Sequence, residues 1–147
     1  MHLFIGGAYA GKRDAVRARF DRRVWHSAYE GHDLEDWPNR AVPGKTLVLE
    51  GWEQWLDVSL RDTDRSDDQL RQELVSHLEA LLGVERDQDI QVILIMLEMG
   101  RGIVPMDSHD RRLRDIAGWL AQDAALRADK VWYVWNGLIQ PLPLSII

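Results

Sequence analysis

The chain has 147 residues and a formal net charge of −6, from 24 acidic and 18 basic side chains. With 46% hydrophobic and 29% charged residues, it is expected to form one soluble domain over residues 1–147. The acidic balance argues against a general nucleic-acid binder, because such proteins neutralise phosphates with basic side chains. Cysteine is absent, which excludes disulfides. The longest apolar runs have only strand length, so we expect no membrane span and a cytoplasmic location.

A glycine-rich loop follows the first predicted strand, Leu3–Ile5. The spacing Gly6-x4-Gly11-Lys12 is that of a P-loop, whose backbone N–H groups hold a phosphate while the lysine reaches the outer phosphates. A P-loop continues with Ser or Thr, whose hydroxyl holds Mg²⁺, but here Arg13 follows. A plain turn between strand and helix therefore stays open as the alternative. The predicted cofactor-binding residues are Gly6, Gly7, Ala8, Tyr9, Ala10, Gly11, Lys12 and Arg13.

A basic segment follows the loop. Lys12–Arg23 is predicted to be a helix with Ala15, Val16 and Phe20 toward the core, and six of its other residues are Lys or Arg. These charges are either a solvated face or a local field that attracts polyanionic ligands. Alternation and aromatic content then predict a second strand over Val24–Tyr29.

Two predicted strands end in carboxylates. Thr46–Leu49, which follows a loop over Gly31–Gly44, reads as a short buried strand and leads into Glu50. The near-continuous apolar run Gln91–Leu97 is typical of a central parallel strand and leads into Glu98. A carboxylate at such a position can orient a metal or an acceptor hydroxyl, and an ordinary strand-end residue is the alternative.

Helices are predicted between and after these strands. Apolar spacing indicates helices over Trp52–Arg61 and Asp67–Gly83, with Gly83 as the stop of the second. Ser108 is predicted to cap a further long helix, and Lys130–Leu138 to form the last strand. This alternation predicts a P-loop-type three-layer α/β/α fold with a mainly parallel sheet.

The carboxyl ends of the strands carry the candidate site. Ligands of such sheets bind beyond these ends, where we expect the glycine-rich loop, Glu50, Glu98 and the pair Asn136-Gly137 to meet. The sequence therefore favours nucleotide binding. The five histidines have no metal-ligand spacing, so no protein metal site is predicted.

The stretch Glu98–Gln122 carries distinctive motifs. It opens with the turn Glu98–Pro105 (EMGRGIVP) and continues with Arg112–Gly118 (RLRDIAG), while Gly6–Lys12 precedes it and Gly137 follows a later strand. In this order the motifs resemble the adenosylcobinamide kinase / adenosylcobinamide-phosphate guanylyltransferase family of cobalamin assembly. The resemblance covers about the last third of the chain and its first dozen residues.

The resemblance implies a transferase. It implies binding of ATP or GTP and of a corrinoid, phosphorylation of adenosylcobinamide, guanylyl transfer as a second activity, and a homo-oligomer. Lys12 would hold the donor phosphates, and Glu50 or Glu98 would orient the acceptor hydroxyl or a metal. Mg²⁺ stays open, because Arg13 either contacts phosphate directly or blocks the metal position.

The guanylyl-accepting histidine is the weakest match to the family. His32, with Trp37 after it, is the residue that could align with it, but the four residues between them include three carboxylates that would repel a phosphate. The alternative is a catalytically impaired nucleotide-binding relative that acts as a regulatory or assembly subunit. Arg13 and this acidic loop favour that alternative, whereas the motifs after Glu98 favour retained chemistry.

Overall fold

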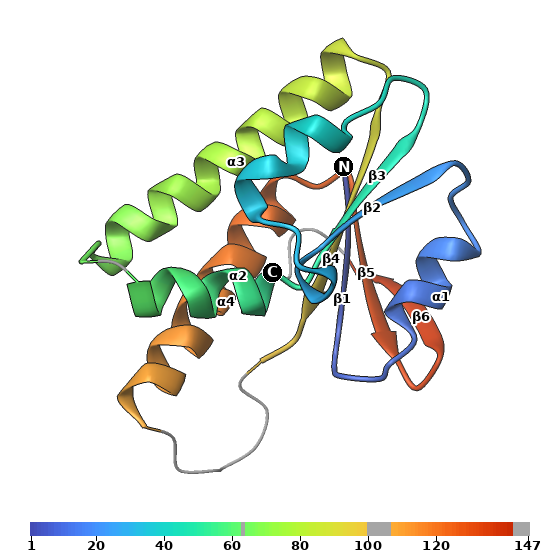
Figure 1. The fold of residues 1–147 in the computed structure, drawn as a ribbon. Coiled ribbons are helices and arrows are strands. Elements are labelled where there is room, and N and C mark those ends of the chain that lie inside the picture. The colour runs from blue at the N-terminus through green and yellow to red at the C-terminus, as the bar shows by residue number, and fades with distance from the viewer. Residues whose placement is uncertain (63, 100–106, 143–147) are drawn as a thin grey trace.

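A computed structural model describes residues 1–62, 64–99 and 107–142. Six strands form one sheet in the order β2-β3-β4-β1-β5-β6 (Figure 1). The strands are β1 (His2–Gly6), β2 (Arg23–Ser27), β3 (Thr46–Glu50), β4 (Gln91–Leu97), β5 (Lys130–Trp135) and β6 (Leu138–Leu142). The helices are α1 (Lys12–Arg17), α2 (Trp52–Asp62), α3 (Asp67–Asp87) and α4 (Ser108–Arg127), with 3-10 turns at Ala28–Glu30 and Leu34–Arg40.

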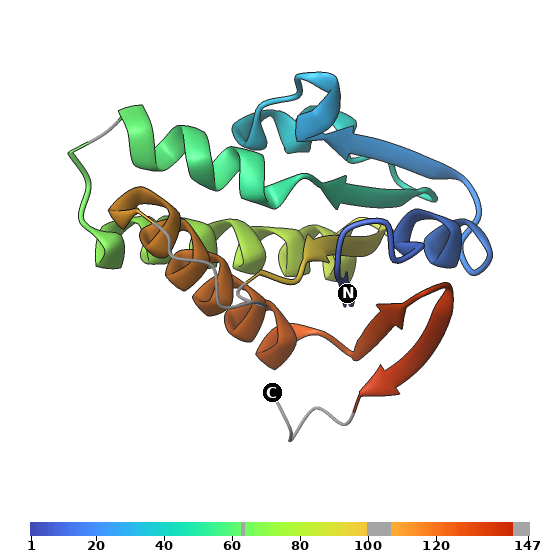
Figure 2. The same ribbon diagram turned by 90° about the horizontal axis from the view of Figure 1, so that it is seen from below.

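The predicted α/β fold with a mainly parallel sheet is confirmed. Strands β1 to β5 pair in parallel, and only β6 runs antiparallel to its neighbour. The predicted last strand, Lys130–Leu138, is wrong in extent, because the chain reverses at Asn136 and Gly137. Both residues have positive φ, 46° and 75°, as a tight two-residue hairpin turn requires. Figure 2 shows the resulting β6 at one edge of the sheet and β2 at the other.

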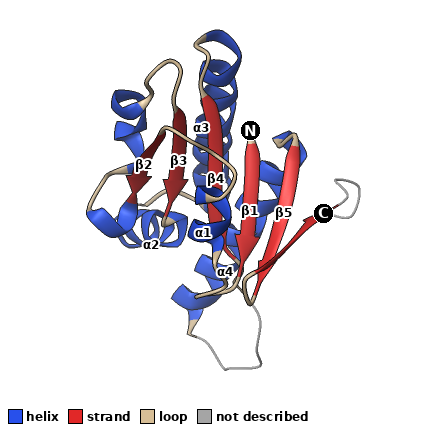
Figure 3. Cartoon of the chain, turned by 90° about the vertical axis from the view of Figure 1, so that its right-hand side faces the viewer, coloured by secondary structure: helices blue, strands red, loops and turns tan. Residues whose placement is uncertain are grey.

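Helices cover both faces of the sheet and make three layers. Helices α2, α3 and α4 lie on one face, and α1 lies on the other (Figure 3). Side chains of a strand point alternately to the two faces of the sheet. Leu47 and Leu49 lie in the core under the three long helices, whereas Val48 lies in the second cluster, with Val16 of α1. Burying apolar side chains on both faces explains why the central strands read as continuous apolar runs.

Two predicted helix ends are wrong. Helix α1 ends at Arg17, so the prediction of a helix up to Arg23 is too long; β2 begins at Arg23, and the connection needs the residues between. Helix α3 continues through Gly83 to Asp87. Val84, just after Gly83, packs against the core, and tertiary packing of this kind overrides the weak helix propensity of glycine.

The start of α4 differs by one residue from the prediction. Asp107, and not Ser108, is the N-cap residue, since its carboxylate accepts a hydrogen bond from the backbone N–H of Asp110 at 2.8 Å. Either residue type can satisfy a free N–H group of the first turn. None of the helices in the described ranges is long and apolar enough to cross a membrane.

Candidate phosphate-binding site

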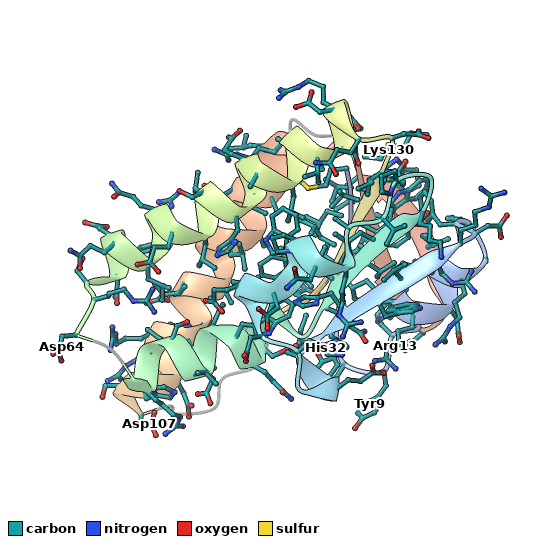
Figure 4. The ribbon with its side chains drawn as sticks, turned by 45° about the horizontal axis from the view of Figure 1, so that its top comes forward. Tyr9, Arg13, His32, Asp64, Asp107 and Lys130 are labelled. Atoms are coloured by element: carbon teal, nitrogen blue, oxygen red, sulfur yellow. The ribbon has the colours of Figure 1, made fainter. Side chains whose placement is uncertain are left out.

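The glycine-rich loop links β1 to α1 at the carboxyl end of the parallel strands. Figure 4 shows Tyr9 and Arg13 at this end of the molecule and Lys130, the first residue of β5, at the opposite end. The loop turns through positive φ angles at Tyr9 (58°) and Gly11 (97°). The Tyr9 side chain is fully exposed and points away from the protein (Figure 4).

Neighbouring backbone holds this loop in place. A Cβ atom on Gly6 would lie 2.2 Å from the carbonyl oxygen of Val134 in β5, so only glycine fits at this position. The backbone N–H of Gly137 donates to the Ala10 carbonyl at 2.9 Å. The Asn136-Gly137 turn therefore lies against the glycine-rich loop and supports it.

Lys12 lies across the loop. Its ammonium group donates to the carbonyl oxygens of Gly6 at 3.1 Å and Gly7 at 2.5 Å. Burial lowers the pKa of Lys12, and the carboxylates Glu53, Glu50 and Glu98 oppose that shift. A phosphate entering the loop would offer the ammonium group stronger, charged acceptors than these two carbonyls.

Arg13 is bound to Glu50, the carboxylate at the end of β3. The guanidinium donates from Nε to Oε2 at 2.7 Å and from its second nitrogen to Oε1, so both carboxylate oxygens are engaged. Glu50 is only 2% exposed, whereas the Arg13 side chain is 43% exposed. The hydrogen bonds to Glu50 raise the pKa of Arg13. Buried charges need such partners, because an unpaired carboxylate is costly away from water.

Two aromatic rings flank the Arg13 guanidinium. Its carbon lies 5.6 Å from the ring centre of Trp25 and 5.9 Å from that of Tyr29. Arg17 lies over Trp25 as well, at 5.3 Å. The Tyr29 hydroxyl donates to a carboxylate oxygen of Glu53 at 3.0 Å, and burial together with that bond raises the pKa of Tyr29. Arg17 belongs to the basic segment that the sequence analysis singles out, but the sequence did not assign Trp25 and Tyr29 to the site, although the aromatic alternation of the second predicted strand was their signal.

The loop residues 8–13, together with Tyr29 and Glu50, border a cavity of about 650 Å³, a volume typical of small-molecule sites. It is bordered by loop backbone, by basic side chains and by an apolar floor. Its lining residues are Ala8, Tyr9, Ala10, Gly11, Lys12, Arg13, Asp14, Arg17, Tyr29, Glu50, Ile95 and Leu97. The structure thus brings Glu50 together with residues 8–13 of the predicted loop, whereas Gly6 and Gly7 are not among the lining residues.

The residues present do not fit the magnesium site of a P-loop. The position of the metal-binding hydroxyl holds Arg13, and both oxygens of the nearby carboxylate, Glu50, accept hydrogen bonds from that arginine. A divalent cation here would meet a fixed positive charge instead of oxygen ligands. Among the described residues, no group of three or more His, Asp or Glu side chains is arranged to hold a metal ion.

Glu98 lies beside the loop but does not line the cavity. Its backbone N–H donates to the Gly6 carbonyl at 2.7 Å, and its carboxylate accepts from the Tyr133 hydroxyl at 2.8 Å. It is close enough to Lys12 to raise that residue's pKa. Most of the predicted turn Glu98–Pro105 lies outside the described residues.

His32 does not line the cavity. Its Nδ1 accepts a hydrogen bond from the Ser27 backbone N–H at 3.0 Å, and its ring stacks on His26 with 5.3 Å between ring centres. The carbonyl of His32 accepts from the indole of Trp55 in α2 at 2.8 Å. The histidine is therefore tied to the α2 side of β2.

His26, the other ring of this stack, is fully buried. Its Nε2 lies 2.6 Å from the Asp33 carbonyl oxygen, so Nε2 carries the proton, and its buried Nδ1 finds no hydrogen-bond partner among the residues that the structure describes. Protonation of Nδ1 would bury a charge with no acceptor. Burial accordingly lowers the pKa of His26 below its ordinary value of 6.5.

We expect the protein to lose stability on mild acidification. In the unfolded chain His26 takes up a proton near pH 6.5, whereas folded His26 takes it up only at a lower pH. The free energy of unfolding is therefore highest above pH 6.5 and decreases as the pH falls toward the lowered pKa. His2 and His77, whose pKa values burial also lowers, act in the same direction. Urea unfolding at about pH 7.5 and about pH 5.5 measures the difference. The difference in the free energy of unfolding between the two pH values should be smaller in His26→Leu. An unchanged difference in that variant would contradict the role given to His26.

Comparison with known protein families identifies the chain. The family model described as CobU, cobinamide kinase / cobinamide phosphate guanyltransferase, matches residues 12–142. The chain belongs to this family. The resemblance predicted from the motifs is thereby confirmed. The match to the CobU family begins at Lys12, so the argument for the preceding glycines rests on the geometry described above.

Curated relatives carry names from the same pathway. The bifunctional adenosylcobalamin biosynthesis protein CobP of Pseudomonas aeruginosa is 34% identical over 104 residues, 71% of this chain and 57% of the relative. The bifunctional protein CobU of Escherichia coli is 34% identical over 79 residues, 53% of this chain and 44% of the relative. CobU of Salmonella typhimurium is 46% identical over 48 residues, 33% and 26% of the two chains. The chain thus spans about half the length of the first two relatives.

Proposed function

We propose that this CobU-family protein binds ATP or GTP in the cavity beside the glycine-rich loop and transfers the terminal phosphoryl group to adenosylcobinamide. The observation that carries the proposal is the cavity itself, in which the loop, Lys12 and Arg13 surround a space of about 650 Å³. The family description supplies the acceptor, because it names cobinamide as the substrate of the kinase.

In phosphoryl transfer the protein mainly positions the two substrates and neutralises the negative charge of the phosphates. The acceptor hydroxyl oxygen forms a bond to the γ-phosphorus, and the bond from that phosphorus to the bridging oxygen breaks, releasing a nucleoside diphosphate. Lys12 exchanges its two carbonyl acceptors for donor phosphate oxygens, and Arg13 stabilises charge on the same phosphates. Glu50 holds Arg13 in position. Glu98, beside the loop, is our candidate for orienting the acceptor hydroxyl and taking its proton.

Guanylyl transfer through His32 is a separate prediction with less support. A histidine that accepts a guanylyl group attacks with an unprotonated ring nitrogen, and the Nδ1 of His32 already accepts a backbone hydrogen bond. The ring is also not among the cavity residues. These two observations argue against guanylyl transfer through His32. The second candidate function stays a catalytically impaired nucleotide-binding relative that serves as a regulatory or assembly subunit. The homo-oligomer implied by the resemblance stays a prediction for sedimentation analysis.

Nucleotide binding and turnover test the proposal together. Calorimetry with ATP and GTP should give saturable binding, and mass spectrometry should detect phosphorylated adenosylcobinamide after incubation with the same nucleotides. Lys12→Ala should weaken binding by about a hundredfold, because a charged contact to phosphate is lost. Lys45→Ala is the matched control, since Lys45 is exposed at the amino end of β3. Nucleotide binding without turnover would favour the hypothesis of a catalytically impaired relative. The absence of nucleotide binding would show that the loop is only a structural turn.

A further inference from the structure

Arg13 occupies the sequence position of the P-loop Ser or Thr whose hydroxyl binds the metal ion. We propose that the Arg13 guanidinium takes over the charge of that ion, so that this protein binds a nucleoside triphosphate without a divalent cation. The inference rests on the nucleotide site proposed above. It is carried by the Arg13–Glu50 ion pair, in which the residue that replaces the P-loop hydroxyl engages both oxygens of the nearby carboxylate.

The Arg13 guanidinium is held by Glu50 and two rings, and among the described residues no second hydrogen-bond partner takes its remaining N–H groups. Two of its nitrogens bind Glu50, and the rings of Trp25 and Tyr29 flank its carbon at 5.6 Å and 5.9 Å. A guanidinium has about five N–H groups, and the pair with Glu50 engages only part of them. Arg13 lines the cavity with 43% of its side chain exposed. A phosphate oxygen can therefore reach the remaining N–H groups while the ion pair stays intact.

The charge distribution of the cavity favours a polyanion without a metal. The lining holds three basic side chains and two carboxylates, and each carboxylate is paired with an arginine, Glu50 with Arg13 and Asp14 with Arg17. A free divalent cation would have to compete with an arginine for either carboxylate of the lining. For Glu50 to bind such a cation, its ion pair with Arg13 would have to break at a site where the carboxylate is 2% exposed.

The chain offers a closely matched control pair elsewhere. Arg71 of α3 binds Asp123 of α4 through Nε at 2.9 Å and a second nitrogen at 2.8 Å. Asp123 is 8% and Arg71 41% exposed, and the guanidinium lies 5.2 Å from the ring centre of Trp119. Arg71→Thr thus removes the same kind of interaction as Arg13→Thr, but between two helices and away from the cavity.

Calorimetric titration with ATP and GTP, in EDTA and in excess MgCl₂, tests the inference. The unmodified protein should bind each nucleotide with an affinity that differs by less than about threefold between the two buffers. Arg13→Thr, which restores the P-loop hydroxyl and frees Glu50, should bind about tenfold or more weakly in EDTA and recover with Mg²⁺. Arg71→Thr should behave like the unmodified protein. Circular dichroism and urea unfolding report whether each variant is folded.

Each outcome has a distinct meaning. Binding by the unmodified protein that requires Mg²⁺ would overturn the inference and leave the proposed function standing. The absence of nucleotide binding in both buffers would overturn the proposed function and the inference with it. If Arg13→Thr does not fold, the comparison of the two buffers on the unmodified protein still decides the metal requirement, and Arg13→Lys, which keeps a positive charge, should retain metal-free binding with reduced affinity.

Discussion

Arg13→Ala is expected to lower the free energy of unfolding by about 3 kcal/mol, because it leaves the Glu50 carboxylate buried without its partner. Glu50 is 2% exposed and gives both of its oxygens to Arg13. Exposed ion pairs contribute far less, about 0–1 kcal/mol. The large effect therefore comes from the buried carboxylate that remains and not from the attraction that is lost.

A double-mutant cycle separates these two contributions. Glu50→Gln removes the buried charge and leaves Arg13, whose exposed side chain water can solvate, so we expect a loss of about 1 kcal/mol. The double variant Arg13→Ala/Glu50→Gln should be more stable than Arg13→Ala alone, because no carboxylate is left unpaired. Urea unfolding of the four proteins measures the cycle. Additive losses would show that the pair contributes nothing beyond its separate side chains.

Gly6→Ala is expected to destabilise the protein by about 3 kcal/mol or more, since overpacking against rigid backbone cannot be relieved by moving a side chain. The added Cβ would lie 2.2 Å from the carbonyl oxygen of Val134. Gly6 is the last residue of β1, the strand paired between β4 and β5. To admit the methyl group, β5 would have to move away from β1 at the point where the glycine-rich loop begins.

The next glycine is the control for this prediction. A Cβ on Gly7 would meet no atom within 4 Å, so Gly7→Ala should change stability by less than about 0.5 kcal/mol. Thermal unfolding of the two variants beside the unmodified protein gives the comparison. Equal losses at Gly6 and Gly7 would contradict the close approach of β1 and β5. Loss of nucleotide binding in Gly6→Ala is expected as well, because the displaced strand carries the loop.

Part of the candidate site could be predicted from short-range pattern. The loop Gly6–Lys12 is a consecutive motif after a strand, and its position at the sheet edge follows from parallel topology. The carboxylates Glu50 and Glu98 were predicted near it for the same reason, and the structure places Glu50 in the cavity lining and Glu98 beside the loop. The loop containing His32 carries no such pattern. Hydrogen bonds to Ser27 and Trp55 decide where that histidine lies.

The sequence by itself determined the fold class and the place of the glycine-rich loop. Apolar runs of strand length alternating with helical spacing allow little besides a parallel sheet covered on both faces, because that arrangement alone buries both sides of a run such as Gln91–Leu97. These are local properties of consecutive residues. The motifs that resemble the family are likewise runs of consecutive residues, so the family could be predicted without the structure.

Only the tertiary structure decided which residues contact one another around the glycine-rich loop. Arg13 and Glu50 are separated by 37 positions in the sequence, and they meet because α1 lies over the face of the sheet to which β3 brings Glu50. Gly6 and Gly7 are adjacent residues of the same type. The carbonyl oxygen of Val134 faces Gly6, whereas a Cβ atom on Gly7 would meet no atom within 4 Å. Contacts of this kind depend on strand order and register, which no local pattern encodes, and they set the charge of the cavity and its fit to a metal ion.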